Sequence, residues 1–222
     1  MQVMSMSLGE LAAANPAATR VFLRHRLDFC CGGQRSLEDA CRIAGLDPAA
    51  IACEVEQEAR GDTSTHWEQA SQCELADYIE SRYHAALRRE LPPLIEAARK
   101  VELVHARKPA VPRGLADVLA ELFADMETHM RKEETILFPM IRAGAQGEIV
   151  QRPICVMETE HESQGRELSR IRALTGDLRV PAHACATWTA LYHGLEKLEA
   201  DLMQHVHLEN NILFARALRG AA

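Results

Sequence analysis

The stretch 125-DMETHMRKEETILF-138 returns near the end of the chain as 201-DLMQHVHLENNILF-214. Both copies follow the pattern Asp-x3-His-x3-Glu-x2-Ile-Leu-Phe and lie in long segments with helical periodicity. A spacing shared over this length is hard to assign to chance in a helical chain. The repeat therefore predicts two related helices with a common purpose.

Each copy places an imidazole and a carboxylate on one face of its helix. A helix turns about 100° per residue, so positions i and i+4 are offset by only about 40°. His129 and Glu133 therefore share a face, and so do His205 and Glu209. Imidazole and carboxylate groups are ligands that suit iron, manganese or zinc. The Ile-Leu-Phe triplet beyond each pair is expected to seal one end of such a site.

Two further histidines give the chain a two-fold pattern. His84 precedes His129 by 45 residues, and His161 precedes His205 by 44 residues. One His-x3-Glu alone would be an ordinary i,i+4 pair, but burying the whole set without a metal would cost several kcal/mol. Six ligands are too many for one tetrahedral zinc ion, and they suit two metal ions bridged by two carboxylates. The candidate metal ligands are His84, His129, Glu133, His161, His205 and Glu209.

Three acidic residues are candidates for supporting these ligands. Asp125 and Asp201 each precede a ligand histidine by one turn, where they could accept a hydrogen bond from its non-ligating N–H group; the alternative is a solvated acidic side chain. Glu160 is either a proton relay or, as we favour, a surface charge. His207, about 200° around the helix from His205, is expected to face away from the site. It is interpreted as structural or solvent-facing, together with His25, His66, His105, His183 and His193.

The chain is predicted to be all-α, because it lacks the sustained alternation of strands. Residues 1–60 are predicted to form a small helical domain, residues 61–70 a linker, and residues 71–222 an up-down four-helix bundle. Pro92 and Pro93 should kink or divide the first long helix. The four long helices are expected at residues 71–104, 115–143, 150–175 and 182–218.

The composition narrows the class of protein. A hydrophobic fraction of 47% in 222 residues is enough for a core, and a net charge of −7 argues against a nucleic-acid surface. The sequence has no run of 18 apolar residues to span a membrane and no basic leader, so the cytoplasm is the expected compartment. Most of the seven cysteines should then be free thiols. Five isolated ones are expected to pack as small buried hydrophobes: Cys41, Cys53, Cys73, Cys155 and Cys185.

The segment 28-DFCCGG-33 places two thiols, Cys30 and Cys31, beside two glycines. By itself this segment is compatible with a disulfide, a metal clip or a reactive nucleophile. It is also compatible with two incidental thiols at a helix end capped by Gly32. The role of the thiols depends on what else the chain carries.

The order His…His-x3-Glu…His…His-x3-Glu on four helices resembles a hemerythrin-like di-iron bundle. With "CCGG" in a short N-terminal helical domain, the whole chain resembles the repair-of-iron-centres di-iron proteins of bacteria. The resemblance implies two non-haem iron ions held by the six candidate ligands. Glu133 and Glu209 would bridge the irons, together with an oxo or hydroxo group. The oxygen-carrying hemerythrins use five histidines, whereas this chain offers four, which disfavours oxygen carriage.

The resemblance also implies a function, namely the recovery of iron–sulfur clusters damaged by nitric oxide or peroxide. It does not separate iron donation from reduction of nitric oxide to nitrous oxide. The implied partners are damaged iron–sulfur proteins and nitric oxide, without nucleic acid or membrane, and a homodimer is compatible with the sequence. Cys30 and Cys31 then become candidates for accepting iron, nitrosyl groups or electrons, carried by an N-terminal domain that swings between the centre and a client.

Two other functions compete with this interpretation. A hemerythrin-like bundle could sense or bind oxygen, iron or nitric oxide without turnover. A ferroxidase or peroxidase of the ferritin type is less favoured, because those bundles use mostly carboxylates and Glu-x-x-His.

Overall fold

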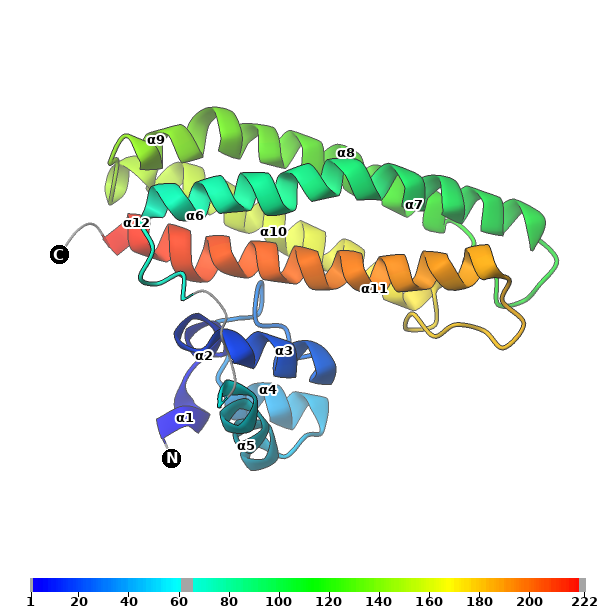
Figure 1. Cartoon of the computed structure of the whole chain (residues 1–222), viewed down its shortest axis with the longest axis horizontal. Helices are drawn as coiled ribbons and strands as arrows, with labels where there is room; N and C mark the ends of the chain where they lie inside the picture. The colour runs from blue at the N-terminus through cyan, green and yellow to red at the C-terminus, as the bar shows by residue number, and fades with distance from the viewer. Residues whose placement is uncertain (1, 61–65, 220–222) are drawn as a thin grey trace.

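The computed structural model describes residues 2–60 and 66–219, and these residues are folded into helices. Among them the only β pairing is an isolated bridge between Ser7 and Ser36. The all-α prediction is confirmed. Figure 1 shows a long helical bundle with a small group of N-terminal helices packed beneath it.

The N-terminal unit is built from short helices whose starts are set by local capping. The Asn15 side chain accepts a hydrogen bond from the backbone N–H of Ala17, and Pro16 occupies the first helical turn. Asp47 and Pro48 repeat this arrangement two helices later. The helices are α1 (Gln2–Ser5), α2 (Leu8–Ala14), α3 (Pro16–His25), α4 (Leu37–Ala44) and α5 (Pro48–Ala59).

The bundle follows the four predicted long helices closely. Each rod except the third is a run of α- and π-helical segments, and the rods alternate in direction. The first rod is α6 (Gln72–Ile79), η1 (Glu80–His84) and α7 (Ala85–Val104). The second is α8 (Leu115–Lys132), η2 (Glu133–Leu137) and α9 (Phe138–Arg142). The third is α10 (Glu148–Leu174), and the fourth is α11 (Ala186–His207), η3 (Leu208–Phe214) and α12 (Ala215–Arg219).

Of the two predicted effects of Pro92 and Pro93, a kink or a division, the division does not occur. Both prolines lie inside α7, which continues for eleven residues beyond Pro93. Proline removes a backbone hydrogen bond from a helix, but Leu91 and Ile95 on either side are buried in the bundle core. Tertiary packing of these side chains offsets the lost hydrogen bonds.

Three of the four rods change from α- to π-helix beside a candidate ligand. His84 is the last residue of η1, Glu133 is the first residue of η2, and Glu209 is the second residue of η3. A π-helical turn inserts an extra residue into the helix and re-aims the side chains around it. These turns lie where the candidate site needs inward-pointing groups.

The N-terminal unit is docked on the fourth rod. The amide of Asn211 donates to the backbone carbonyl of Phe29 at 3.1 Å, and the Phe29 ring meets the ring of His207 edge-on with centroids 5.5 Å apart. His207 thus faces away from the candidate ligands, as expected. It is buried under the N-terminal unit and not exposed to solvent.

The prediction that five isolated cysteines are buried is wrong for four of them. Cys41 is buried, but Cys53, Cys73, Cys155 and Cys185 are exposed. Composition alone does not say which face of an amphipathic helix a residue occupies.

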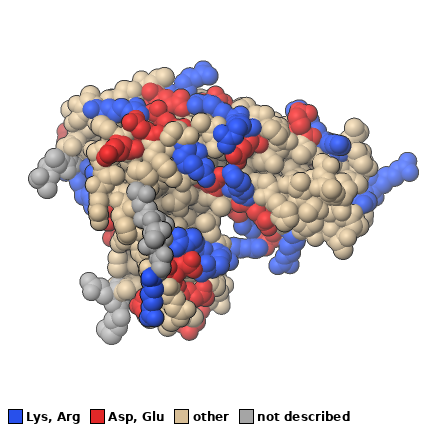
Figure 2. All heavy atoms as spheres, in the orientation of Figure 1, with Lys and Arg blue, Asp and Glu red and all other residues tan. Residues whose placement is uncertain are grey.

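No helix in the described chain is both long and apolar enough to cross a membrane. On the face drawn in Figure 2, acidic and basic side chains are interspersed. Residues 61–65 of the predicted linker lie outside the described residues, and the division of the chain at residues 61–70 stays a prediction.

Candidate metal centre

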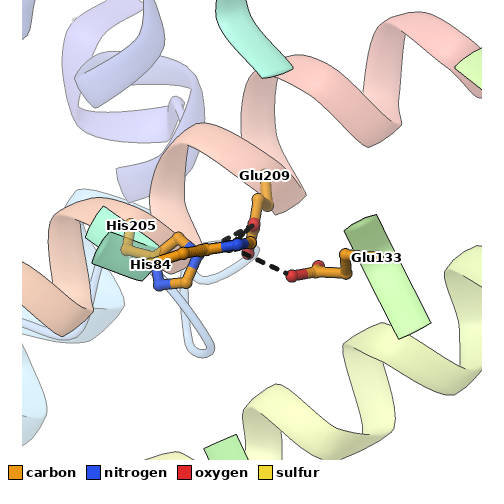
Figure 3. Close-up of side chains that lie close together, drawn as sticks. All are labelled: His84, Glu133, His205 and Glu209. Carbon is orange, nitrogen blue, oxygen red and sulfur yellow. Dashed lines mark hydrogen bonds and ion pairs between the residues drawn. The ribbon is translucent and has the colours of Figure 1, made fainter. Parts of the chain in front are cut away.

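The six candidate ligands gather at one point inside the bundle, where His84, Glu133, His161, His205 and Glu209 are fully buried and His129 is 1% exposed. Their donor atoms form two groups of four, and within each group all the atoms lie within 4.8 Å of one another. Glu133 and Glu209 belong to both groups. Figure 3 shows the group that also contains His84 and His205; the other contains His129 and His161.

The inner contacts bring like groups together. The Nε2 atoms of His84 and His205 are 3.1 Å apart, and those of His129 and His161 are 3.0 Å apart. Glu209 lies between the pairs, with its Oε1 2.9 Å from His205 Nε2 and its Oε2 3.1 Å from His161 Nε2. Glu133 spans the other side, 3.4 Å from the Nε2 atoms of both His84 and His129.

In three of the imidazoles the outer nitrogen, Nδ1, which points away from the centre, contacts a hydrogen-bond acceptor. His84 Nδ1 is 2.8 Å from Glu134 Oε1, His129 Nδ1 is 3.0 Å from Glu160 Oε2, and His161 Nδ1 is 2.7 Å from Asn210 Oδ1. A carboxylate can only accept, so Nδ1 of His84 and of His129 must donate. In a neutral imidazole the inward Nε2 atom then carries a lone pair.

This donor set fits cations. Neutral imidazoles present lone pairs to one another at about 3 Å, and both oxygens of Glu133 and one of Glu209 have no hydrogen-bond partner although they are buried. Buried carboxylates without a partner are costly. Two positive ions, each facing two imidazoles and the shared carboxylates, would satisfy every inward atom.

Without a cation, protons take its place. Burial lowers the pKa of His84, but the neighbouring carboxylates of Glu133 and Glu209 outweigh burial and raise this pKa to about 10. Burial also lowers the pKa of His129, but the negative charge of Glu133 outweighs burial and raises this pKa to about 9. Burial raises the pKa of Glu209, but the charge of His205 and the imidazole hydrogen bonds hold this pKa well below its ordinary value. The pocket is built to hold positive charge.

Asp125 and Asp201 do not hold the ligand histidines. Asp201 accepts hydrogen bonds from Arg82 at 2.8 Å and Lys197 at 2.7 Å, while the buried Nδ1 of His205 has no partner. Asp125 is exposed and lines an open hollow of about 280 Å³ beside His129. The outer nitrogen of each bonded histidine points toward a neighbouring helix, so a residue one turn back on its own helix does not reach it.

Glu160, which we favoured as a surface charge, bonds His129 and also pairs with Lys132. The sequence reasoning missed Glu134 and Asn210. Each directly follows a ligand glutamate, and each bonds the histidine of the preceding rod. The two residues occupy equivalent positions of the repeat, which was the signal that could have revealed them.

The Ile-Leu-Phe triplets close the site partly as predicted. Phe138 stacks on the ring of His84 at 5.9 Å, and Phe214 stacks on the ring of His161 at 6.1 Å. The leucine and phenylalanine of each triplet are buried, while Ile136 is 53% exposed. In both copies of the repeat, the phenylalanine therefore packs on the candidate ligand histidine of the preceding rod.

The two thiols lie against the same centre. Cys31 Sγ is 3.2 Å from the carbonyl oxygen of His161 and 3.7 Å from Cys30 Sγ, so the thiols are not bonded to each other. Asp28 Oδ1 accepts hydrogen bonds from the backbone N–H groups of Cys30 and Cys31, each at 3.1 Å. Helix α3 ends at His25, not at Gly32. The thiols therefore belong to a loop that is folded onto the bundle.

Comparison with known proteins covers both parts of the chain. Residues 76–217 match the family described as the hemerythrin HHE cation binding domain, and residues 4–59 match a domain of unknown function, DUF542. Proteins named iron-sulfur cluster repair protein YtfE are similar over 221 residues, at 45% identity, with 99% of this chain and 100% of theirs aligned. They include those of Yersinia pestis (strain Pestoides F), Yersinia pestis bv. Antiqua (strain Angola) and Yersinia pseudotuberculosis serotype IB (strain PB1/+).

The chain belongs to the repair-of-iron-centres family.

Membership of this family agrees with the geometry. The hemerythrin match spans all six buried side chains, and its description as cation binding agrees with the lone pairs that converge between the helices. The second match contains Cys30 and Cys31. In this chain the two matched regions meet where the Cys31 thiol contacts the His161 backbone.

Proposed function

We propose that this chain holds two non-haem iron ions and repairs damaged iron–sulfur clusters. His84 and His205 would hold one iron, and His129 and His161 the other. Glu133 and Glu209 would bridge the two, with the oxo or hydroxo group that the resemblance implies. The observation that carries the proposal is the pair of buried four-residue groups that share two carboxylates.

The bound irons would supply redox chemistry and sites for small ligands such as nitric oxide. The protein's own part is to position and shield them. Glu134, Glu160 and Asn210 fix the orientation of three imidazoles. Phe138 and Phe214 exclude water from one end. Two histidines per iron leave coordination positions for exchange or ligand binding.

Cys30 and Cys31 are proposed as the group that passes iron or nitrosyl groups between the centre and a client. The Sγ atoms and an Asp28 carboxylate oxygen lie within 4.8 Å of one another, close enough to hold one metal ion. Thiolates suit iron. The contact of Cys31 with the His161 backbone supports this role, because iron in transit, as cargo, would have only a short distance to move.

The test is to purify the protein anaerobically, count iron per chain, and add nitric oxide to the reduced form. About two irons per chain are expected from the two groups of donors. Nitrous oxide produced over several turnovers would support a reductase. A stable nitrosyl with no nitrous oxide would support delivery. Less than about half an iron, with zinc in its place, would contradict the proposal.

The role of the thiols is tested separately. A Cys30→Ala and Cys31→Ala double variant should keep the iron content of the wild type and lose repair of a nitric-oxide-treated iron–sulfur enzyme. A Cys53→Ala and Cys155→Ala double variant, which removes two exposed thiols far from this loop in sequence, is the matched control. Unchanged repair in the first variant would exclude the transfer role.

A sensing or binding module without turnover is the second candidate. It is favoured by the hydrogen bond from Cys31 to His161, because a change at this proposed ligand would be felt directly by the N-terminal unit. Reversible binding of nitric oxide or oxygen that alters the docking of residues 26–36, without product formation, would favour this candidate.

A further inference from the structure

A second group of reactive side chains lies at the opposite end of the bundle. The loop after α7 and the loop before α11 lie together at the right-hand end of Figure 1. Cys185 is the N-cap residue of α11 and is exposed. It precedes His205 by 20 residues, so a rise of about 1.5 Å per residue separates the two by about 30 Å. The chemistry of Cys185 is therefore independent of the metal centre.

An imidazole lies within hydrogen-bond distance of this thiol. His105 directly follows the last residue of α7, and its Nε2 atom is 3.2 Å from Cys185 Sγ. The His105 ring packs on Trp188 with centroids 5.1 Å apart, and Trp188 is fully buried. The buried indole holds the imidazole in place, so the contact has the nucleophile, base and orienting group of an activated thiol.

Positive and partly positive groups surround the sulfur. The backbone N–H groups of Trp188 and Thr187, at the start of α11, lower the pKa of the Cys185 thiol, and the charge of Lys108 adds to this effect. Lys108 is held close by, because its ammonium group donates to the carbonyl oxygen of His183 at 3.0 Å. A thiolate at the N-terminus of a helix and beside cations is the form that reacts.

The other exposed thiols lack this combination in the described structure. Cys155 lies within α10, away from its ends, and Cys53 lies within α5 and accepts a hydrogen bond from the Gln57 amide. Cys185 alone among the described exposed thiols has both an imidazole partner and the N-cap position of a helix.

We propose that Cys185 and His105 form a nucleophilic thiol–imidazole pair, and that Cys185 is a site of mixed-disulfide formation with low-molecular-weight disulfides. The Cys185 sulfur attacks one sulfur of the disulfide. A new S–S bond forms to Cys185 as the S–S bond of the reagent breaks. The thiol proton passes to His105 Nε2 and then to the departing thiolate. The disulfide is the oxidant, so atoms and electrons balance.

The experiment treats the full-length, metal-loaded protein with oxidised glutathione and stops the reaction at short times. Peptide mass spectrometry then gives the rate of mixed-disulfide formation at each thiol. Cys185 is expected to react about three- to tenfold faster than Cys155 in the same molecules, because its thiolate fraction is higher while its intrinsic nucleophilicity is somewhat lower. Equal rates at the two thiols would overturn the proposal, and this comparison needs no variant.

A His105→Gln variant tests the role of the imidazole. The amide keeps a polar contact but is not a base, so the rate at Cys185 should fall toward that of Cys155. The rate at Cys155 and the metal content should stay unchanged, which shows that the bundle is intact. An unchanged rate at Cys185 in an intact variant would overturn the pairing.

Discussion

The thiol of Cys31 donates a hydrogen bond to the carbonyl oxygen of His161 at 3.2 Å, while the imidazole of the same His161 contacts Glu209 at 3.1 Å. One residue is therefore shared by the thiol loop on its backbone side and by the cation site on its ring side. The N-terminal unit is therefore docked through the backbone of a residue whose ring belongs to the candidate metal centre. If Cys30 and Cys31 act on a partner as proposed, the fraction of molecules with the N-terminal unit undocked sets how often these thiols are available.

Weakening the docking contact should expose the thiols. Asn211→Ala removes the 3.1 Å hydrogen bond to the Phe29 carbonyl, at a cost of about 1 kcal/mol. The undocked fraction should rise about fivefold, and Cys30, which is 7% exposed when docked, should be labelled faster by a maleimide. The labelling rate of exposed Cys155 in the same sample is the reference. A Cys30 rate that does not rise relative to Cys155 would contradict this role of Asn211.

Two glycines near the thiols should respond to alanine in opposite ways. A Cβ atom on Gly33 would lie 2.6 Å from the Phe29 carbonyl oxygen, so Gly33→Ala should destabilise the loop by about 1–3 kcal/mol. A Cβ atom on Gly165, inside α10, would meet Cys31 Sγ at 3.4 Å, which is an ordinary contact. Gly165→Ala should stabilise the helix by up to about 1 kcal/mol. Urea unfolding followed by circular dichroism measures both, and a neutral Gly33→Ala would show that the loop relaxes easily.

Glu134 should tune the metal affinity through His84. Glu134→Gln replaces a carboxylate that bonds His84 Nδ1 at 2.8 Å, and losing such a partner lowers metal affinity by about 10–100-fold. Glu127→Gln is the matched control, because Glu127 shares Arg88 with Glu134 but does not bond an imidazole in the described structure. Competition with a chelator under anaerobic conditions measures both affinities. Equal affinities in the two variants would show that Glu134 does not support the site.

Metal loading should release protons. In the metal-free protein the pKa values of His84 and His129 are raised to about 10 and about 9, so both are protonated at neutral pH. A metal ion needs the same lone pairs. Binding at pH 7–8 should therefore release about two protons per chain, and affinity should fall as pH drops below about 10, more steeply below about 9. Anaerobic calorimetry in buffers of different ionisation enthalpy measures the release, and an enthalpy that is independent of the buffer would disprove it.

Much of the candidate site was predictable because it is encoded locally. His129 and Glu133, or His205 and Glu209, share a helix face through backbone geometry alone, and the repeat made their common purpose visible. The side chains that hold the outer nitrogens were harder to predict. Glu160 reaches His129 from a neighbouring helix, and no spacing along one helix reveals such a contact. Asn210 also bonds a histidine of another helix, and only its repeat position, equivalent to that of Glu134, hinted at this. For the same reason the sequence left two alternatives open for Asp125 and Asp201, and in the structure Asp201 bonds Arg82 and Lys197 and not His205.

The sequence by itself determined the all-α class, the four long helices and the six side chains that converge, because helical periodicity and the repeat depend only on neighbours along the chain. Only the tertiary structure decided that α7 continues through Pro92 and Pro93, that His207 is buried under the N-terminal unit, and that Cys31 touches His161. Each of these depends on the packing energy between segments far apart in sequence, and this energy outweighs local preference.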